Sequence, residues 1–424
     1  MTNNCKKTTL KNGLRIITLP VKGTKAATVL VLVGAGSKYE VKEISGLSHF
    51  LEHMFFKGTK RRPNKLKLIE ILDKIGGQYN AFTSQEFTGY WAKVSADHLE
   101  TALDLVSDIY LNSKIEQEEI NRERGTILQE LNMYLDTPTR YVGDLWLSLL
   151  YGDQPAGWPI LGTEKLIKSV KRAQFIEYLK EHYSSKNTIV VVAGQIDYDS
   201  TLAKVRKYFE GINENSAKGK LAVREEQSRP KSLVYYKETD QTHLYLGVRA
   251  YDIFHPDKYA LSLLGTILGG NMSSRLFMSV REKEGLAYYI KTGVDTDTDV
   301  GFLASQAGID NQKVDRAIGL ILKEYRKIAD RRISPAELKK AKDYTKGTTL
   351  LEMESSDAQA SFVGFQELLT NKVLTLEDKF AKIDKVTVDD IQRVAQDIFQ
   401  PAKLNLALIG PFKNKQRFEK ILTL

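Results

Sequence analysis

The sequence predicts an α+β protein built from two similar halves. Each half reads as short apolar strands followed by long helical stretches, which favours a sheet with helices packed on one side. Residues 190–196 and 406–412 are both short apolar strands that contain a glycine, and each follows an amphipathic helical stretch. These two blocks lie 216 residues apart. The chain therefore reads as a duplicated fold.

The individual elements follow from composition and periodicity. Segments rich in β-branched and aromatic residues predict strands over residues 28–34, 90–95, 232–236 and 243–250. Helices are expected over residues 96–111, 173–183, 312–330 and 389–399. Residues 214–220 are polar, contain glycine and lack periodicity, which is typical of a linker. We expect an N-terminal domain over residues 1–212, a linker over 213–231 and a C-terminal domain over 232–424.

Composition excludes several classes of function. A chain of 424 residues is long enough for two or three domains. The net charge of +9 comes from Lys and Arg scattered among acids, without a nucleic-acid-binding motif, so we expect no nucleic-acid partner. No apolar run is long enough for a membrane span, and no secretory h-region precedes Cys5. This single cysteine fits a reducing compartment, and we expect a cytoplasmic protein without membrane partners.

The strongest motif is H-x-x-E-H at residues 49–53. Two histidines four residues apart lie about one turn apart on one face of a helix, so His49 and His53 can reach one zinc ion. Glu52 beside them can take a proton from a zinc-bound water. We expect a helix here with Ser45 as its cap. A helix with two surface histidines is the alternative for so short a motif.

A zinc site of this kind needs a third protein ligand. Residues 116–130 form an acidic helical stretch in which Glu123 and Glu130 are seven residues apart and face the same way. One of them can ligate zinc while the other hydrogen-bonds a ligand. Taken alone, these acids fit a solvated helix face equally well.

With these motifs in this order, the chain resembles the pitrilysin/insulysin-type zinc metallopeptidases, most closely the branch of the mitochondrial processing peptidase and its bacterial relatives. The resemblance extends from residues 10–15 to the C-terminus. It implies two αβ-roll domains, each an antiparallel sheet packed against helices. It also implies that His49, His53 and Glu130 bind zinc, that Glu52 is the general base and that Glu123 supports the ligands.

Two further segments match the family. Residues 76–84 resemble its edge strand beside the zinc, where Asn80, Ala81 and Phe82 would contact an extended substrate. Without the resemblance this segment reads as a glycine turn entering a strand. Residues 281–288 resemble its second-half motif, in which Arg281 and Tyr288 would bind the substrate carbonyl and stabilise the developing oxyanion. Without the resemblance it is a charged helix ending at a glycine.

The second half carries no metal ligands at the equivalent place, because residues 259–264 contain neither histidine nor glutamate. One zinc ion per chain is therefore expected. The whole pattern predicts a zinc-dependent endopeptidase that acts on short or unfolded peptides, and the family's four-domain chambers imply a homodimer. Two alternatives stay open: a subunit of a heterodimer that is inactive alone, and a non-catalytic assembly protein of the same fold.

Overall fold

The structure is a computed structural model that describes residues 5–424. These residues form two compact units. The first unit contains the described residues up to Leu131 together with Pro159–Leu221 and Leu350–Glu377. The second contains Asn132–Trp158, Ala222–Thr349 and Asp378–Leu424. Within the described residues, no helix combines the length and the apolarity that crossing a bilayer requires.

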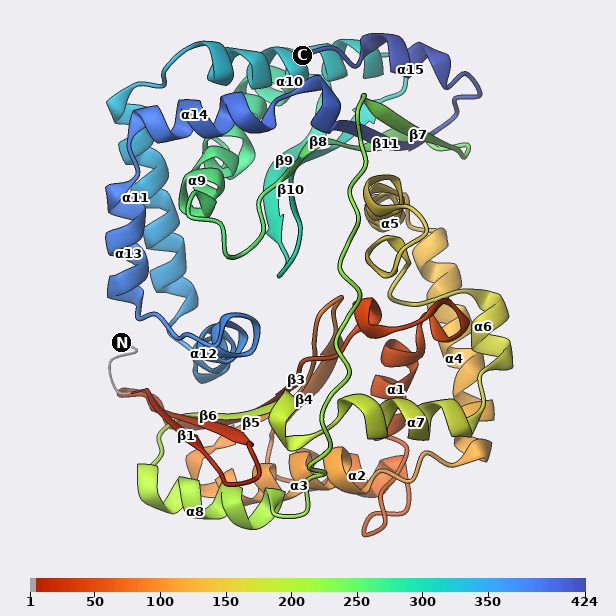
Figure 1. The fold of residues 1–424 in the computed structure, drawn as a ribbon, viewed down its shortest axis with the longest axis vertical. Helices are drawn as coiled ribbons and strands as arrows, with labels where there is room; N and C mark the ends of the chain where they lie inside the picture. Colours follow the sequence, from red (N-terminus) through yellow and green to blue (C-terminus); the bar gives the residue numbers. More distant parts are fainter. Residues whose placement is uncertain (1–4) are drawn as a thin grey trace. The chain divides into compact units, whose positions relative to one another are not determined.

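The first unit is built on a six-stranded sheet (Figure 1). Its strands, in spatial order, are β1 (Lys6–Thr9), β2 (Arg15–Pro20), β6 (Thr188–Gly194), β3 (Ala26–Val33), β5 (Thr88–Ser95) and β4 (Gln78–Thr83). Only β2 and β6 pair in parallel. Strand β4 forms one edge, so the outer side of its backbone has no strand partner within the described chain.

Helices cover both faces of this sheet. They are α1 (Leu47–Phe55), α2 (Lys65–Asp73), α3 (Leu99–Asn112), α6 (Glu164–Ser169), α7 (Arg172–His182), α8 (Tyr198–Phe209) and α12 (Ser356–Thr370), with most of α4 (Gln117–Leu135). Side chains alternate along β3: Val29 and Val31 join a core with α1 and α3, while Leu30 and Leu32 join α12. Burial on both faces explains why β3 is apolar without a break from Val29 to Val33.

The second unit has a five-stranded sheet. Its strands, in spatial order, are β7 (Lys231–Tyr236), β11 (Leu404–Gly410), β8 (Gln241–Ala250), β10 (Gly301–Asp310) and β9 (Ala287–Thr296). Its helices are α5 (Pro138–Tyr151), α9 (Lys258–Gly269), α10 (Val314–Asp330), α14 (Val388–Ile398) and α15 (Gln416–Ile421), with most of α11 (Pro335–Glu352) and α13 (Leu376–Lys385).

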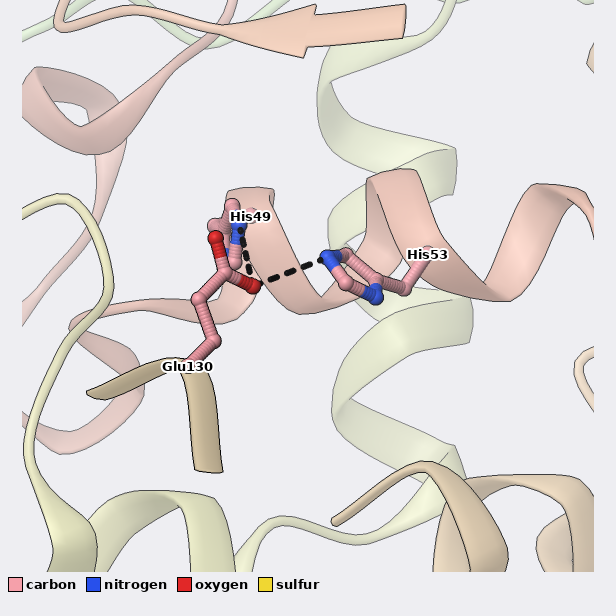
Figure 2. A group of neighbouring side chains, drawn as sticks. All are labelled: His49, His53 and Glu130. Atoms are coloured by element: carbon pink, nitrogen blue, oxygen red, sulfur yellow. Dashed lines mark ion pairs between the residues drawn. The ribbon is translucent and has the colours of Figure 1, made fainter. Parts of the chain in front are cut away.

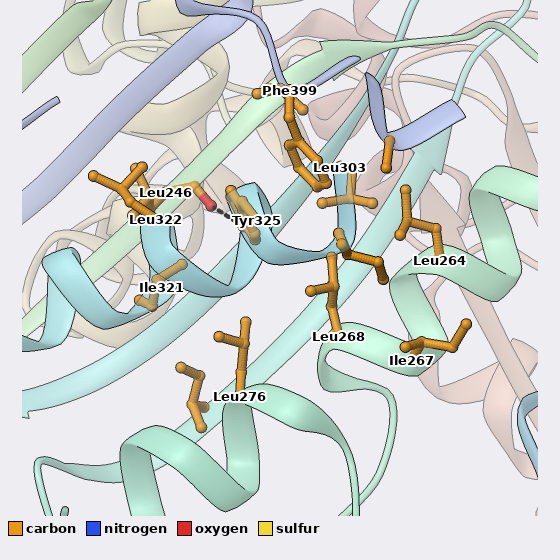
Figure 3. Packing of buried hydrophobic residues seen from close by; sticks show 14 of the residues in the cluster. Leu246, Leu264, Ile267, Leu268, Leu276, Leu303, Ile321, Leu322, Tyr325 and Phe399 are labelled. Carbon is orange, nitrogen blue, oxygen red and sulfur yellow. Dashed lines mark hydrogen bonds between the residues drawn. The ribbon is translucent and has the colours of Figure 1, made fainter. Parts of the chain in front are cut away.

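A dense apolar core fills one side of the second sheet, and Figure 3 shows part of it. The Tyr325 ring of α10 stacks on Phe399 with 4.4 Å between centroids, and its hydroxyl donates to the Leu246 carbonyl oxygen at 2.9 Å. This bond gives the buried hydroxyl a partner. On the other side, the Trp146 ring of α5 packs against Tyr245 and Phe302.

The two sheets repeat one topology, which confirms the predicted duplication. Apart from the extra edge strand β1, the strand orders correspond. The last strand of each unit lies between two earlier strands, parallel to one and antiparallel to the other: β6 with β2 and β3, and β11 with β7 and β8. Strands β6 and β11 begin at residues 188 and 404, which keeps the offset of 216 seen in the sequence. The predicted α+β class with two similar halves is correct.

The segment between α8 and β7 contains no helix or strand. The compact units are nevertheless not two consecutive stretches of chain. Helix α12 belongs to the second half of the sequence but packs in the first unit, and α5 belongs to the first half but packs in the second. Each helix covers the sheet face that lies opposite the larger core of its unit.

Candidate metal centre

Helix α1 presents its apolar side to the core and its ionisable side to the site. Leu47, Phe50, Leu51 and Met54 are buried, as the helical period of the motif predicts. The helix start differs from the prediction that Ser45 is the cap. Gly46 occupies that position with φ of 99°, a left-handed conformation that favours glycine, and no side chain caps from there.

The first turn of α1 is instead capped from outside the helix by Glu40. Its two carboxylate oxygens accept hydrogen bonds from the Gly46 and Ser48 backbone N–H groups at 2.7 and 2.6 Å. These N–H groups belong to the helix end that lacks internal partners. A carboxylate six residues upstream can satisfy them because the chain turns through a short 3-10 helix, Lys42–Ile44, before α1 begins.

Three predicted ligands converge in the first unit (Figure 2). The Glu130 carboxylate of α4 points between the two imidazoles of α1. Its Oε2 lies 3.7 Å from His49 Nε2 and 3.5 Å from His53 Nε2. One ligand atom from each residue lies within 4.8 Å of the other two. Among residues 5–424, this is the group of His, Cys, Asp and Glu side chains that could hold a metal ion.

The geometry fits zinc. A tetrahedral zinc ion bonds nitrogen and oxygen ligands at about 2.0–2.2 Å, which separates neighbouring ligand atoms by about 3.3–3.6 Å. The separation of 3.5 Å from His53 falls in that range, and the separation of 3.7 Å from His49 lies just above it. Two imidazoles and one carboxylate also form a donor set that catalytic zinc sites use, with a fourth position left open.

The two histidines have different electrostatic surroundings. Burial lowers the pKa of His49 to about 4, so its imidazole is neutral at pH 7, the state that binds a metal. Burial also lowers the pKa of His53, but hydrogen bonds to Glu123 and Glu130 outweigh it and raise the pKa to about 9. Metal binding at His53 therefore has to displace a proton.

Glu123 supports His53 from the side away from Glu130. Its Oε1 accepts a hydrogen bond from His53 Nδ1 at 2.9 Å, and its Oε2 pairs with Lys57 Nζ. This leaves His53 Nε2 directed at Glu130. A carboxylate behind a ligating imidazole fixes the tautomer and increases the basicity of the ligand. Lys57 was not predicted as part of the site, because it lies two residues beyond the end of α1 and its pairing with Glu123 depends on the fold.

Glu52 has the environment of a general base. Burial raises the pKa of its carboxyl, and the hydrogen bond that Thr83 Oγ1 donates to Oε2 at 2.7 Å lowers it in part. A raised carboxyl pKa moves toward neutral pH, where proton transfer is most effective. Thr83 was also missed. It follows Phe82 at the end of β4, and strand alternation from Ala81 could have indicated its direction.

The predicted substrate segment is the edge strand β4. Asn80 is exposed, Ala81 is buried and Phe82 is half-buried, as alternation along a strand requires. The Asn80 side-chain oxygen accepts a hydrogen bond from the Ala81 backbone N–H at 2.9 Å. The Phe82 ring packs beside Phe365 of α12, with 6.0 Å between centroids. An unpaired edge can receive an extended peptide through main-chain hydrogen bonds.

Arg281 and Tyr288 lie in the second unit, and their part in catalysis stays a prediction. The segment Phe277–Lys283 is a π-helix, a rare form that is frequent at functional sites. The Arg281 guanidinium lies over the Phe277 ring at 4.7 Å, and the Tyr288 side chain is 76% exposed at the start of β9. Helix α9, which follows β8 as α1 follows β3, contains no His, Cys, Asp or Glu.

Known proteins of the peptidase class match the chain over almost its whole length. The insulinase family (peptidase family M16) matches residues 15–164, and the M16 inactive domain matches residues 169–344. The uncharacterized zinc protease YmxG of Bacillus subtilis is 35% identical over 96% of this chain and 99% of its own. An uncharacterized zinc protease of Mycobacterium leprae is 33% identical over 98% of this chain and 94% of its own.

Solved structures show the same fold. A protease from Helicobacter pylori superposes with a TM-score of 0.89 at 26% identity, over 96% of this chain and 99% of that chain. A peptidase M16 inactive domain from Pseudomonas fluorescens gives the same TM-score at 17% identity, over 96% and 98% of the two chains. The chain belongs to the M16 family of peptidases.

Proposed function

We propose that this protein is a zinc-dependent endopeptidase that cleaves short or unfolded peptides bound as an extended strand. The observation that carries the proposal is the convergence of His49, His53 and Glu130 at zinc-like separations beside Glu52. Relatives named as zinc proteases over nearly the whole chain support the same conclusion.

In the proposed reaction, His49, His53 and Glu130 hold one zinc ion per chain, which supplies Lewis-acid chemistry when bound. Glu52 accepts a proton from the attacking water as the water oxygen bonds to the peptide carbonyl carbon. The bond between that carbon and the amide nitrogen then breaks, and Glu52 returns the proton to the leaving nitrogen. Thr83 bonds Oε2 of Glu52 and so keeps the carboxylate oriented through both transfers.

Substrate binding in this proposal uses the free edge of β4. Asn80, Ala81 and Phe82 would contact a peptide strand laid along that edge, and the Asn80 side chain would release the Ala81 N–H to the substrate. Arg281 and Tyr288 would bind the substrate carbonyl. We further propose a homodimer in the cytoplasm, in which two chains supply the four domains of a chamber.

The test is cleavage of a defined peptide mixture by the wild-type chain and Glu52→Gln, each with and without a chelator. We expect Glu52→Gln to keep its zinc and to lose at least about a hundredfold in turnover, the low end for general acid–base catalysis. Glu118→Gln, an exposed glutamate of α4, is the matched control and should cleave like wild type. Cleavage by Glu52→Gln at the wild-type rate would contradict the mechanism. No cleavage by the wild type would contradict an active homodimer and favour the two alternatives, a heterodimer subunit that is inactive alone or a non-catalytic assembly protein.

A further inference from the structure

Helix α1 is capped by the buried carboxylate of Glu40. The Glu40 residue is 2% exposed, and its two oxygens hold two N–H groups of the first helical turn. A serine cap at Ser45 would satisfy one such group. Glu40 satisfies two, and its ionised form places a negative charge at the helix N-terminus, where the helix dipole favours it. Burial raises the pKa of this carboxyl to about 7, against the lowering effect of those hydrogen bonds.

The backbone around this cap is closely packed. A Cβ added to Gly46 would lie 2.6 Å from the Cα of Gly162. A Cβ added to Gly162, which has φ of 74°, would lie 2.3 Å from the Ser45 carbonyl oxygen. The Ser48 hydroxyl is also held, by a 2.8 Å hydrogen bond to the Tyr178 hydroxyl. The start of α1 therefore packs closely against the backbone at Gly162 and is hydrogen-bonded to the Glu40 carboxylate.

The first turn of α1 determines where the ligands point. His49 follows Ser48 directly, and His53 lies one turn later on the same face. Each residue of an α-helix advances 1.5 Å and turns by about 100°, so a small slip or rotation at the first turn moves both imidazoles relative to Glu130 on α4. Such a movement changes the separations between the three ligand atoms, and a zinc site depends on ligands that converge on one point.

We propose that Glu40 is a positioning residue of the metal centre, because it fixes the first turn of α1 and thereby the separations of His49 and His53 from Glu130. The inference rests on the proposed function in one respect, the identity of the metal. Its alternative is a purely structural cap, whose loss would lower stability and leave the metal site unchanged. The two roles differ in their effect on zinc affinity.

The experiment compares Glu40→Gln with Glu367→Gln. The first keeps the side-chain size but replaces one accepting oxygen with an NH2 group, which cannot accept from a backbone N–H. The second alters a carboxylate that is equally buried in the same unit but that pairs with Lys7 and Arg15 on β1 and β2. Zinc affinity is measured by competition with a chelator, coordination by the visible spectrum of the Co²⁺-loaded protein, and stability by melting of the metal-free protein.

We expect the zinc affinity of Glu40→Gln to fall about ten- to a hundredfold, the range for residues that support metal ligands, with an altered Co²⁺ spectrum. Glu367→Gln should melt earlier and keep wild-type zinc affinity. Wild-type affinity and spectrum in Glu40→Gln would overturn the inference. If that variant does not fold, zinc affinity and the Co²⁺ spectrum are measured on Glu40→Asp instead, and wild-type values there would overturn the inference. A wild-type chain that binds no zinc would overturn the proposed function as well, which separates the two failures.

Discussion

The support of His53 by Glu123 and Lys57 allows a quantitative prediction for Lys57→Met. The Lys57 and Glu123 side chains are 15% and 7% exposed, and Glu123 has His53 as its other partner. Burial raises the pKa of Glu123, but hydrogen bonds from His53 and Lys57 outweigh it and hold the pKa below the usual range. Methionine keeps much of the volume and apolar stem of lysine and removes the charge.

The expected size of the effect follows from this burial. An exposed ion pair contributes about 0–1 kcal/mol, whereas breaking a fully buried pair costs about 3–5 kcal/mol. The pair here is partly buried, and Glu123 keeps one partner, so we expect Lys57→Met to lower the unfolding free energy by about 2 kcal/mol. Zinc affinity should fall about ten- to a hundredfold, because Glu123 then orients His53 less firmly.

Urea unfolding of the metal-free protein and chelator competition for zinc measure these two quantities. Lys168→Met is the control, since Lys168 pairs with Glu164 on an exposed helix surface and its loss should change stability by no more than about 1 kcal/mol. Unchanged zinc affinity in Lys57→Met would refute the role assigned to Lys57. A loss of stability as small as that of the control would refute the estimate from burial.

Three other predictions concern Glu123 behind His53, the buried His182, and the assembly of two chains. Glu123→Gln should reduce turnover in steady-state assays by about ten- to a hundredfold, less than Glu52→Gln, and an equal or larger loss would contradict the roles assigned to the two residues. Burial lowers the pKa of His182 to about 4. Between about pH 6.5 and 4, the unfolded chain therefore binds a proton at this histidine that the folded chain does not bind. The wild type should therefore lose about 2 kcal/mol more unfolding free energy than His182→Phe between pH 7.5 and 5, and equal losses in urea titrations would contradict this. Mixing inactive Glu52→Gln and Tyr288→Phe chains should restore peptide cleavage if one chain completes the site of its partner, and no recovery in proven mixed dimers would refute that arrangement.

Much of the fold was predictable because its signals are local or periodic. The apolar run of β3 and the offset between β6 and β11 are visible in the sequence, and the structure confirms both. The packing of helices α12 and α5 could not be predicted from the sequence. Each has an apolar face, but no local signal tells which sheet that face covers, and each packs in the unit formed mainly by the other sequence half.

The features of the candidate site that lie within one helix could also be predicted, whereas contacts between separate elements could not. The spacing of His49 and His53 is a property of one helix, and the sequence therefore predicted it correctly as a pair on one face. The contacts of Lys57 with Glu123 and of Thr83 with Glu52 join separate elements, and only the folded chain shows them. The cap of α1 was predicted incorrectly for the same reason, because Ser45 is a good local candidate and the Glu40 carboxylate reaches the helix from an upstream turn.

The most direct test of the proposed zinc centre is the metal content of the purified chain. Elemental analysis should find about one zinc ion per wild-type chain, because three protein ligands converge once in the described chain. The double variant His49→Ala/His53→Ala should contain almost none, while Glu52→Gln should keep the full amount. Full zinc occupancy in the double variant, or no zinc in the wild type, would contradict the assignment of this site.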